Sequence, residues 1–96
     1  MAAPHVGLLI TELHIPGADS LKDKRSVIKS ILAVSRREYN VSGAEIDHLD
    51  NRRRSELAFT CVSNRPSQCR EVIASVLKYL DSLPDIEVTS SEIEQW

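Results

Sequence analysis

The stretch HVGLLITELHIPGADSLKDKRSVIKSI, residues 5–31, holds a strand, a turn and the start of a helix in direct succession. Its first part, 5–15, is aliphatic and β-branched without a helical period, which predicts a largely buried strand. The Pro-Gly pair at 16–17 ends that strand. Ser20 then suits the N-cap of a helix, with Asp23 three positions later as in a capping box. The stretch therefore predicts a strand that leads into a helix.

The chain continues with three more strands and one more helix. Alternation of apolar and polar residues predicts strands at 41–49 and 55–63, joined by the polar turn 50–54 as a hairpin. Pro66 stands in the first turn of a second helix, which Leu83-Pro84-Asp85 ends, and a fourth strand is expected at 86–93. The apolar residues of the second helix have the cleanest helical spacing of the chain: Cys69, Val72, Ile73, Val76, Leu77 and Leu80.

This order of elements, strand-helix-strand-strand-helix-strand, is the ferredoxin-like βαββαβ pattern of the α+β class. Right-handed crossovers then predict a four-stranded antiparallel sheet of order 4-1-3-2 with both helices on one face. With 96 residues, we expect one domain that spans 1–96.

Composition excludes several classes of protein. The net charge of −2 does not indicate a strongly basic nucleic-acid-binding domain, and no apolar run is long enough to cross a membrane. Cys61 and Cys69 are too few for a disulfide framework and lack metal-ligand spacing, so we expect buried thiols in a cytoplasmic protein, with a disulfide between them as the alternative.

Positive charge is concentrated in the first predicted helix, where residues 22–37 hold six Lys or Arg against one Asp. The topology also places the 50–54 turn at the end of the domain where this helix begins. Exposed helix amides and several cations at one end predict a site for phosphate or another anion. We expect this site to comprise Ser20, Lys22, Lys24, Arg25, Arg52, Arg53 and Arg54.

Two alternatives apply to these surfaces. Charge runs are usually solvated faces, and Asp23, Asp50 and Glu56 can neutralise neighbouring cations. The second concerns the open sheet face. Val6, Leu8, Ile10, Ala58 and Val62 would lie on it and would suit a face-to-face homodimer, whereas a register shifted by one residue would swap the two faces.

His14 and His48 end two predicted strands at the same end of the domain as the basic residues. We expect structural or hydrogen-bonding roles for them, as accessory residues, with an acid-base role or a metal site as the alternative. The strand between them would hold the rings about 10 Å apart, too far for shared metal ligation. The chain has no Gly-rich phosphate loop, no G-x-S-x-G and no H-E-x-x-H, so we expect no catalytic residues, no metal and no cofactor.

Three segments, HIPGADSLKDKR at 14–25, AEIDH at 44–48 and LAFTCVSN at 57–64, resemble the YlxP-like bacterial family of unknown function. The resemblance covers nearly the whole chain and departs from the family at Asn-Arg-Arg-Arg, 51–54. It implies a small cytosolic ferredoxin-like protein without established catalytic residues. Members are often encoded beside translation and ribosome-maturation genes, which implies an association with ribosomal or precursor RNA.

We therefore expect a non-enzymatic binding protein that contacts RNA phosphates through its basic end. A dimeric regulatory module that binds a small anionic metabolite at the same helix start is the alternative function.

Overall fold

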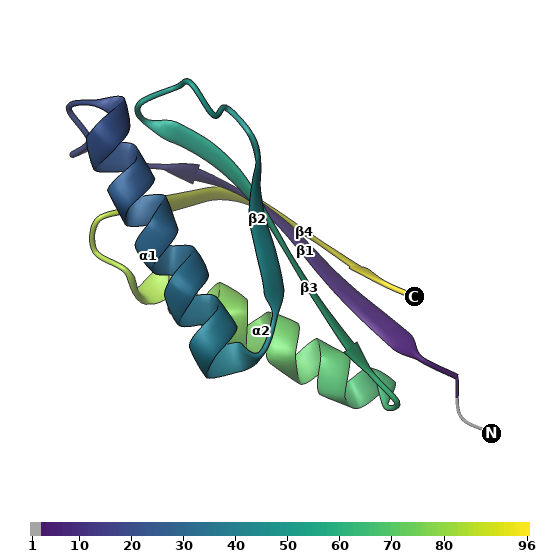
Figure 1. Ribbon diagram of the computed structural model, residues 1–96. Helices are drawn as coiled ribbons and strands as arrows, with labels where there is room; N and C mark the ends of the chain where they lie inside the picture. The colour runs from purple at the N-terminus through teal and green to yellow at the C-terminus, as the bar shows by residue number, and fades with distance from the viewer. Residues whose placement is uncertain (1–2) are drawn as a thin grey trace.

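The computed structural model describes residues 3–96 and has the predicted order of elements (Figure 1). A four-stranded antiparallel sheet of order β2-β3-β1-β4 has both helices on one face, so the predicted ferredoxin-like α+β fold is confirmed. Neither helix within residues 3–96 is both long and apolar enough to cross a membrane. The elements are β1 His5–His14, α1 Leu21–Tyr39, β2 Ser42–Asp47, β3 Arg54–Ser63, α2 Pro66–Ser82 and β4 Glu87–Gln95.

Local chemistry sets both ends of α1. The Ser20 hydroxyl accepts a hydrogen bond from the Asp23 backbone N–H at 3.1 Å, so the predicted N-cap is confirmed. The Asp23 carboxylate accepts from the Asp19 backbone N–H at 3.1 Å and thereby covers the helix start. At the other end, Asn40 has a left-handed φ of 53° and donates its N–H to the Arg36 carbonyl at 3.2 Å.

The core lies between the helices and the inner face of the sheet. Leu9 and Leu13 of β1 and Phe59 of β3 are fully buried, whereas Ile10 and Glu12, which alternate with the buried residues of β1, face the other side. Of the two registers that the sequence left open, the structure has the one that places Val6, Leu8 and Ile10 on the open face, because a shift by one residue would have exposed Leu9, Leu13 and Phe59. The remaining core side chains from α1, β3 and α2 are Ile28, Ile31, Leu57, Ile73, Val76 and Leu80.

The outer face of the sheet is apolar at one end and polar at the other. Val62, Val6 and Trp96 form one row across β3, β1 and the end of β4, since Val6 pairs with Val62 and exchanges backbone hydrogen bonds with Trp96. At the far end of the same face, Arg54 pairs with His14. We call this side the outer face.

Strand β2 is shorter than expected, because it ends at Asp47 rather than at residue 49. Its pairing with β3 shifts between Glu45 and Asp47, and His48 adopts a left-handed φ of 63°. This bulge and the turn after it direct the chain out of the sheet toward the start of α1 (Figure 1).

Candidate functional site

Lys24 is fully buried at the start of α1, although its charge had suggested a solvent-facing role. Its ammonium donates to the backbone carbonyls of His48 at 2.7 Å, Leu49 at 3.2 Å and Arg54 at 3.2 Å. A fourth acceptor, the Glu45 carboxylate, lies 2.9 Å away. The side chain is therefore occupied in holding the β2–β3 loop against α1, and the expectation that it contacts an anion does not fit its position.

Glu45 and Ser55 complete this buried cluster. Glu45 occupies the inner face of β2 with 16% of its side chain exposed, and the Ser55 hydroxyl donates to it at 2.6 Å. Ser55 is itself buried. A buried ammonium is tolerated only when it is paired and hydrogen-bonded, and this cluster meets both conditions. The sequence analysis did not predict Glu45 and Ser55 as partners of Lys24. The only signal for them was that each is a polar residue on the buried side of its strand, β2 for Glu45 and β3 for Ser55.

The loop that Lys24 holds carries two of the predicted cations to the start of α1. The Arg53 carbonyl accepts from the Ile15 N–H at 2.8 Å, and the Arg53 Nε donates to the Ala18 carbonyl at 3.1 Å. Lys22 is exposed in the first turn of α1, and Arg52 is exposed in the loop. The structure thus brings the 50–54 turn and the helix start together, as the topology suggested.

Two of the predicted cations, Arg25 and Arg53, form weak ion pairs at this end of the domain. Arg25 lies 3.8 Å from Asp50, and Arg53 lies 3.8 Å from Asp19, with the four side chains well exposed. Ser20, by contrast, is engaged as the helix cap.

Arg54 separates from the other cations, because its side chain lies on the outer face of the sheet. It forms an ion pair with Glu12 of β1, to which its Nε donates at 3.1 Å. This hydrogen bond from Arg54 holds the pKa of Glu12 below its ordinary value. His48 Nε2 lies 3.4 Å from the same Glu12 carboxylate, so Glu12 joins the β2–β3 loop to the outer face.

The two histidines have separate partners. His14 Nδ1 lies 3.4 Å from the Glu87 carboxylate on β4, whereas His48 contacts Glu12. Within residues 3–96, no three His, Cys, Asp or Glu side chains are grouped as metal ligands. Beside His14 there is a pocket of about 370 Å³ that Glu12, Arg54 and Ser90 also line. It is shallow and its one guanidinium already has a carboxylate partner.

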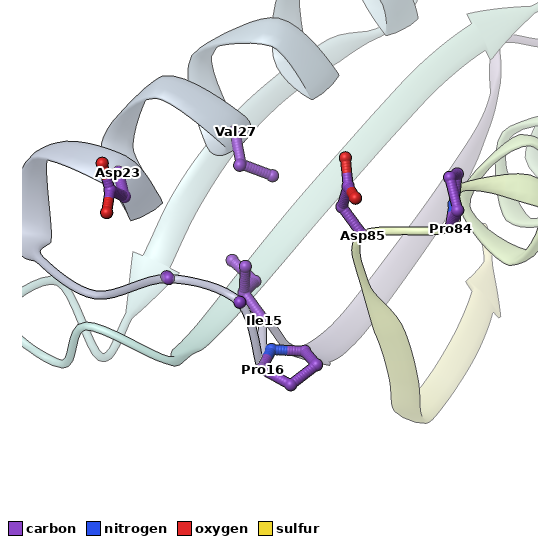
Figure 2. Close-up of a pocket in the computed structure, with 8 residues that line it drawn as sticks. Ile15, Pro16, Asp23, Val27, Pro84 and Asp85 are labelled. Atoms are coloured by element: carbon purple, nitrogen blue, oxygen red, sulfur yellow. The ribbon is translucent and has the colours of Figure 1, made fainter.

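A second pocket, of about 350 Å³, lies between the β1–α1 connection and the α2–β4 connection (Figure 2). Ile15, Pro16 and Val27 give it an apolar wall, and Asp23 and Asp85 lie at its sides. With two carboxylates and no cation among its lining residues, this pocket does not suit an anion.

The two cysteines are free thiols, with Cys69 buried and Cys61 half-buried. Cys69 Sγ contacts the His5 carbonyl at 3.4 Å. Burial, followed by a hydrogen bond with Cys69, raises the pKa of the Cys61 thiol. A raised pKa lowers the thiolate fraction, which argues for a packing role rather than nucleophilic chemistry.

Comparison with known proteins identifies relatives of unknown function. Residues 6–93 match a protein-family profile described as a protein of unknown function, DUF503. The chain is 36% identical over 89 residues to the uncharacterized protein YlxP of Bacillus subtilis strain 168, which covers 93% of this chain and 97% of YlxP. The predicted YlxP-like resemblance is therefore confirmed.

Two solved structures share the fold at low sequence identity. The de novo designed protein Foldit4 has a TM-score of 0.55 and 17% identity, with 96% of each chain covered. A mutant of SnoaB, a cofactor-independent oxygenase from Streptomyces nogalater, has a TM-score of 0.52 and 17% identity, with 95% of this chain and 90% of SnoaB covered. Because a designed protein and an oxygenase share this architecture, the fold alone does not assign an activity.

Proposed function

We propose a binding role for this chain, which belongs to the DUF503 family of proteins of unknown function. Its partner is structured RNA, contacted at the phosphates through four exposed or half-exposed cations at one end of the domain. These four, Lys22, Arg25, Arg52 and Arg53, are called the cationic end. Ribosomal or precursor RNA is the class of RNA that the YlxP-like resemblance favours.

The observation that carries this proposal is the buried Lys24 cluster. By fixing the β2–β3 loop on α1, it presents Arg52 and Arg53 beside the first turn of the helix. A surface that is already rigid loses less conformational entropy when it binds. Lys24 therefore contributes to the proposed site by positioning the loop, not by contacting a phosphate.

Charges near the cationic end remain available to a polyanion. Four cations lie with three acids, Asp19, Asp23 and Asp50, which leaves a local net charge of +1. The ion pairs of Arg25 and Arg53 are 3.8 Å long and exposed, and such pairs contribute little stability in water. Several phosphates that approach together can displace these carboxylates, whereas one small anion forms fewer ion pairs with the cations and displaces the carboxylates less readily.

A small anionic metabolite is the alternative ligand of the same end, but it receives less support. The start of α1 already holds the Ser20 hydroxyl and the Asp23 carboxylate, each bound to a backbone N–H. An anion that used the helix amides would have to face the Asp23 carboxylate. The RNA proposal avoids this conflict, because it relies on the Lys and Arg side chains and not on the helix amides.

Charge reversal tests the RNA proposal. In Lys22→Glu/Arg52→Glu, affinity for a short structured RNA is expected to fall at least about tenfold, and the slope of log affinity against log salt by about 2, since two phosphate contacts are lost. Fluorescence anisotropy across a salt series measures both. The matched control, Arg70→Glu/Lys78→Glu on the exposed side of α2, makes the same change in net charge.

Two results would contradict this assignment. Equal losses in the two double variants would show attraction to net charge without a site. The absence of binding at low salt would remove RNA as the partner, and a thermal shift with inorganic phosphate would then favour the small-anion alternative.

A second proposal concerns a homodimer through the outer face. Val62 and Trp96 are 69% and 66% exposed in one apolar row with Val6. The four strands lie about 4.8 Å apart and hold 10, 6, 10 and 9 residues, so their outer face offers roughly 550 Å² per copy. Two such faces bury roughly 1,100 Å², which exceeds the roughly 1,000 Å² expected of a biological interface.

The dimer is tested by sedimentation equilibrium. The chain is expected to have twice the mass of one copy, and Val62→Thr/Trp96→Gln is expected to raise the dimer dissociation constant at least about tenfold, because this row would lie in the apolar part of the interface. Leu49→Gln, an exposed apolar residue of the β2–β3 loop, serves as the control and should leave the mass unchanged. A monomer at all concentrations would refute the interface.

A further inference from the structure

Strand β4 is a long, exposed sheet edge without a partner on one side. It lies at the end of the order β2-β3-β1-β4, and within residues 3–96 it pairs only with β1. Eight of its nine residues are exposed. Proteins normally keep exposed edge strands short, place Lys or Pro on them, or cover them, because the free backbone groups of an edge pair readily with other chains. Glu87–Gln95 contains neither Lys nor Pro.

The register shows which backbone groups are free. Val6 and Trp96 exchange both of their backbone hydrogen bonds, at 2.7 and 2.8 Å, so they form a closely spaced antiparallel pair. Such pairs recur at every second residue, so Glu94 and Glu92 also direct their N–H and C=O groups toward β1. The backbone groups of the residues between them, Ser91, Ile93 and Gln95, therefore point away from the sheet.

The charges along this edge are negative and largely unpaired. Glu92 and Glu94 pair across the sheet with Ile10 and Leu8, so the two carboxylates stand beside aliphatic side chains on the outer face. Among the described residues, no Lys, Arg or His lies in ion-pair contact with either of them, whereas Glu87 contacts His14. Lys and Arg suit this setting, since their stems pack on apolar surface while their charges reach a carboxylate.

A second copy of the chain does not fit this edge. Antiparallel pairing of two β4 strands centred on Ile93 would set Glu92 of one copy directly opposite Glu94 of the other. Centred on Glu92, the pairing would oppose two copies of that residue. Like charges in directly opposed positions destabilise a sheet. The acids therefore discourage self-association at the edge and favour a basic strand.

We propose that β4 accepts an extended, basic segment of another protein as a fifth strand of the sheet. The segment alternates Lys or Arg with Val or Ile. Its basic side chains lie on the outer face beside Glu92 and Glu94, and its apolar side chains lie on the helix side beside Ile93, which is 55% exposed. This surface differs from the cationic end and takes a ligand of opposite charge.

The test uses an acetylated and amidated peptide of sequence Lys-Val-Lys-Val-Lys-Val. Isothermal titration calorimetry is expected to show saturable binding, and amide hydrogen exchange of Ser91, Ile93 and Gln95 is expected to slow when the peptide is bound. Glu92→Lys/Glu94→Lys should weaken binding at least about tenfold, because two charge pairs are lost and repulsion replaces them.

Two further probes separate strand addition from charge attraction. Ile93→Pro removes an outward N–H and keeps the hydrogen bonds to β1, so the protein should stay folded while affinity falls at least about tenfold. A peptide with N-methyl groups on alternate amides tests the same contact with unaltered protein. The proposal is supported if affinity falls in Glu92→Lys/Glu94→Lys, in Ile93→Pro and with the N-methylated peptide. Loss only in the Glu92→Lys/Glu94→Lys variant, or absence of binding, overturns it.

Discussion

Replacing Lys24 by methionine is expected to lower the free energy of unfolding by about 3–5 kcal/mol, as measured by urea denaturation. Methionine keeps the apolar stem but removes the ammonium from a position with no exposed surface. The Glu45 carboxylate is then left with Ser55 as its remaining side-chain partner, and the carbonyls of His48 and Leu49 lose their donor. An unpaired buried charge is among the largest single-residue penalties.

Two further variants make this expectation specific. Lys29→Met, on the exposed side of the same helix, should change stability by about 0.5 kcal/mol or less. Adding Glu45→Leu to Lys24→Met should recover a large part of the loss, because the unpaired carboxylate is gone. A double variant as unstable as the sum of the two single variants would contradict the charge pairing as the source of the stability.

Lys24 also shows where sequence reasoning stops. A lysine in a run of cations is normally exposed, and nothing in the spacing of SLKDKR, residues 20–25, distinguishes Lys24 from Lys22. Its burial depends on the carbonyls of His48 and Leu49 in the β2–β3 loop and of Arg54 at the start of β3. Contacts of this kind follow from tertiary structure, so they could not be predicted from the pattern.

The topology was predictable because its signals are local, whereas the sequence left two registers of the sheet open. The aliphatic run of β1, the period of two in β2 and β3 and the period of 3.6 in α2 are set by the residues themselves, and Pro16 and Pro66 mark boundaries. For Arg54 the prediction is wrong. The polar run 50–54 predicts a turn, but Arg54 is the first residue of β3, where strand alternation directs its side chain to the outer face.

Gly43→Ala is expected to destabilise the domain by about 1–3 kcal/mol, although the change adds one methyl group. Gly43 of β2 pairs with Phe59 of β3, and a Cβ at this position would lie 2.8 Å from Phe59 Cδ1 and 3.1 Å from Leu32 Cδ2. The ring is fully buried, so it has little room to move. Thermal or urea unfolding measures the loss.

Gly17→Ala is the matched control, because nothing lies within 4 Å of a Cβ at that position. Neither glycine has a positive φ, so backbone strain is the same in both variants. The control should therefore be neutral or more stable by about 0.4–1 kcal/mol, since alanine restricts the unfolded chain. Phe59→Leu, although it costs stability alone, should reduce the penalty of Gly43→Ala by removing the atoms that clash. Equal effects of the two glycine substitutions would show that close packing of β2 on Phe59 does not limit this position.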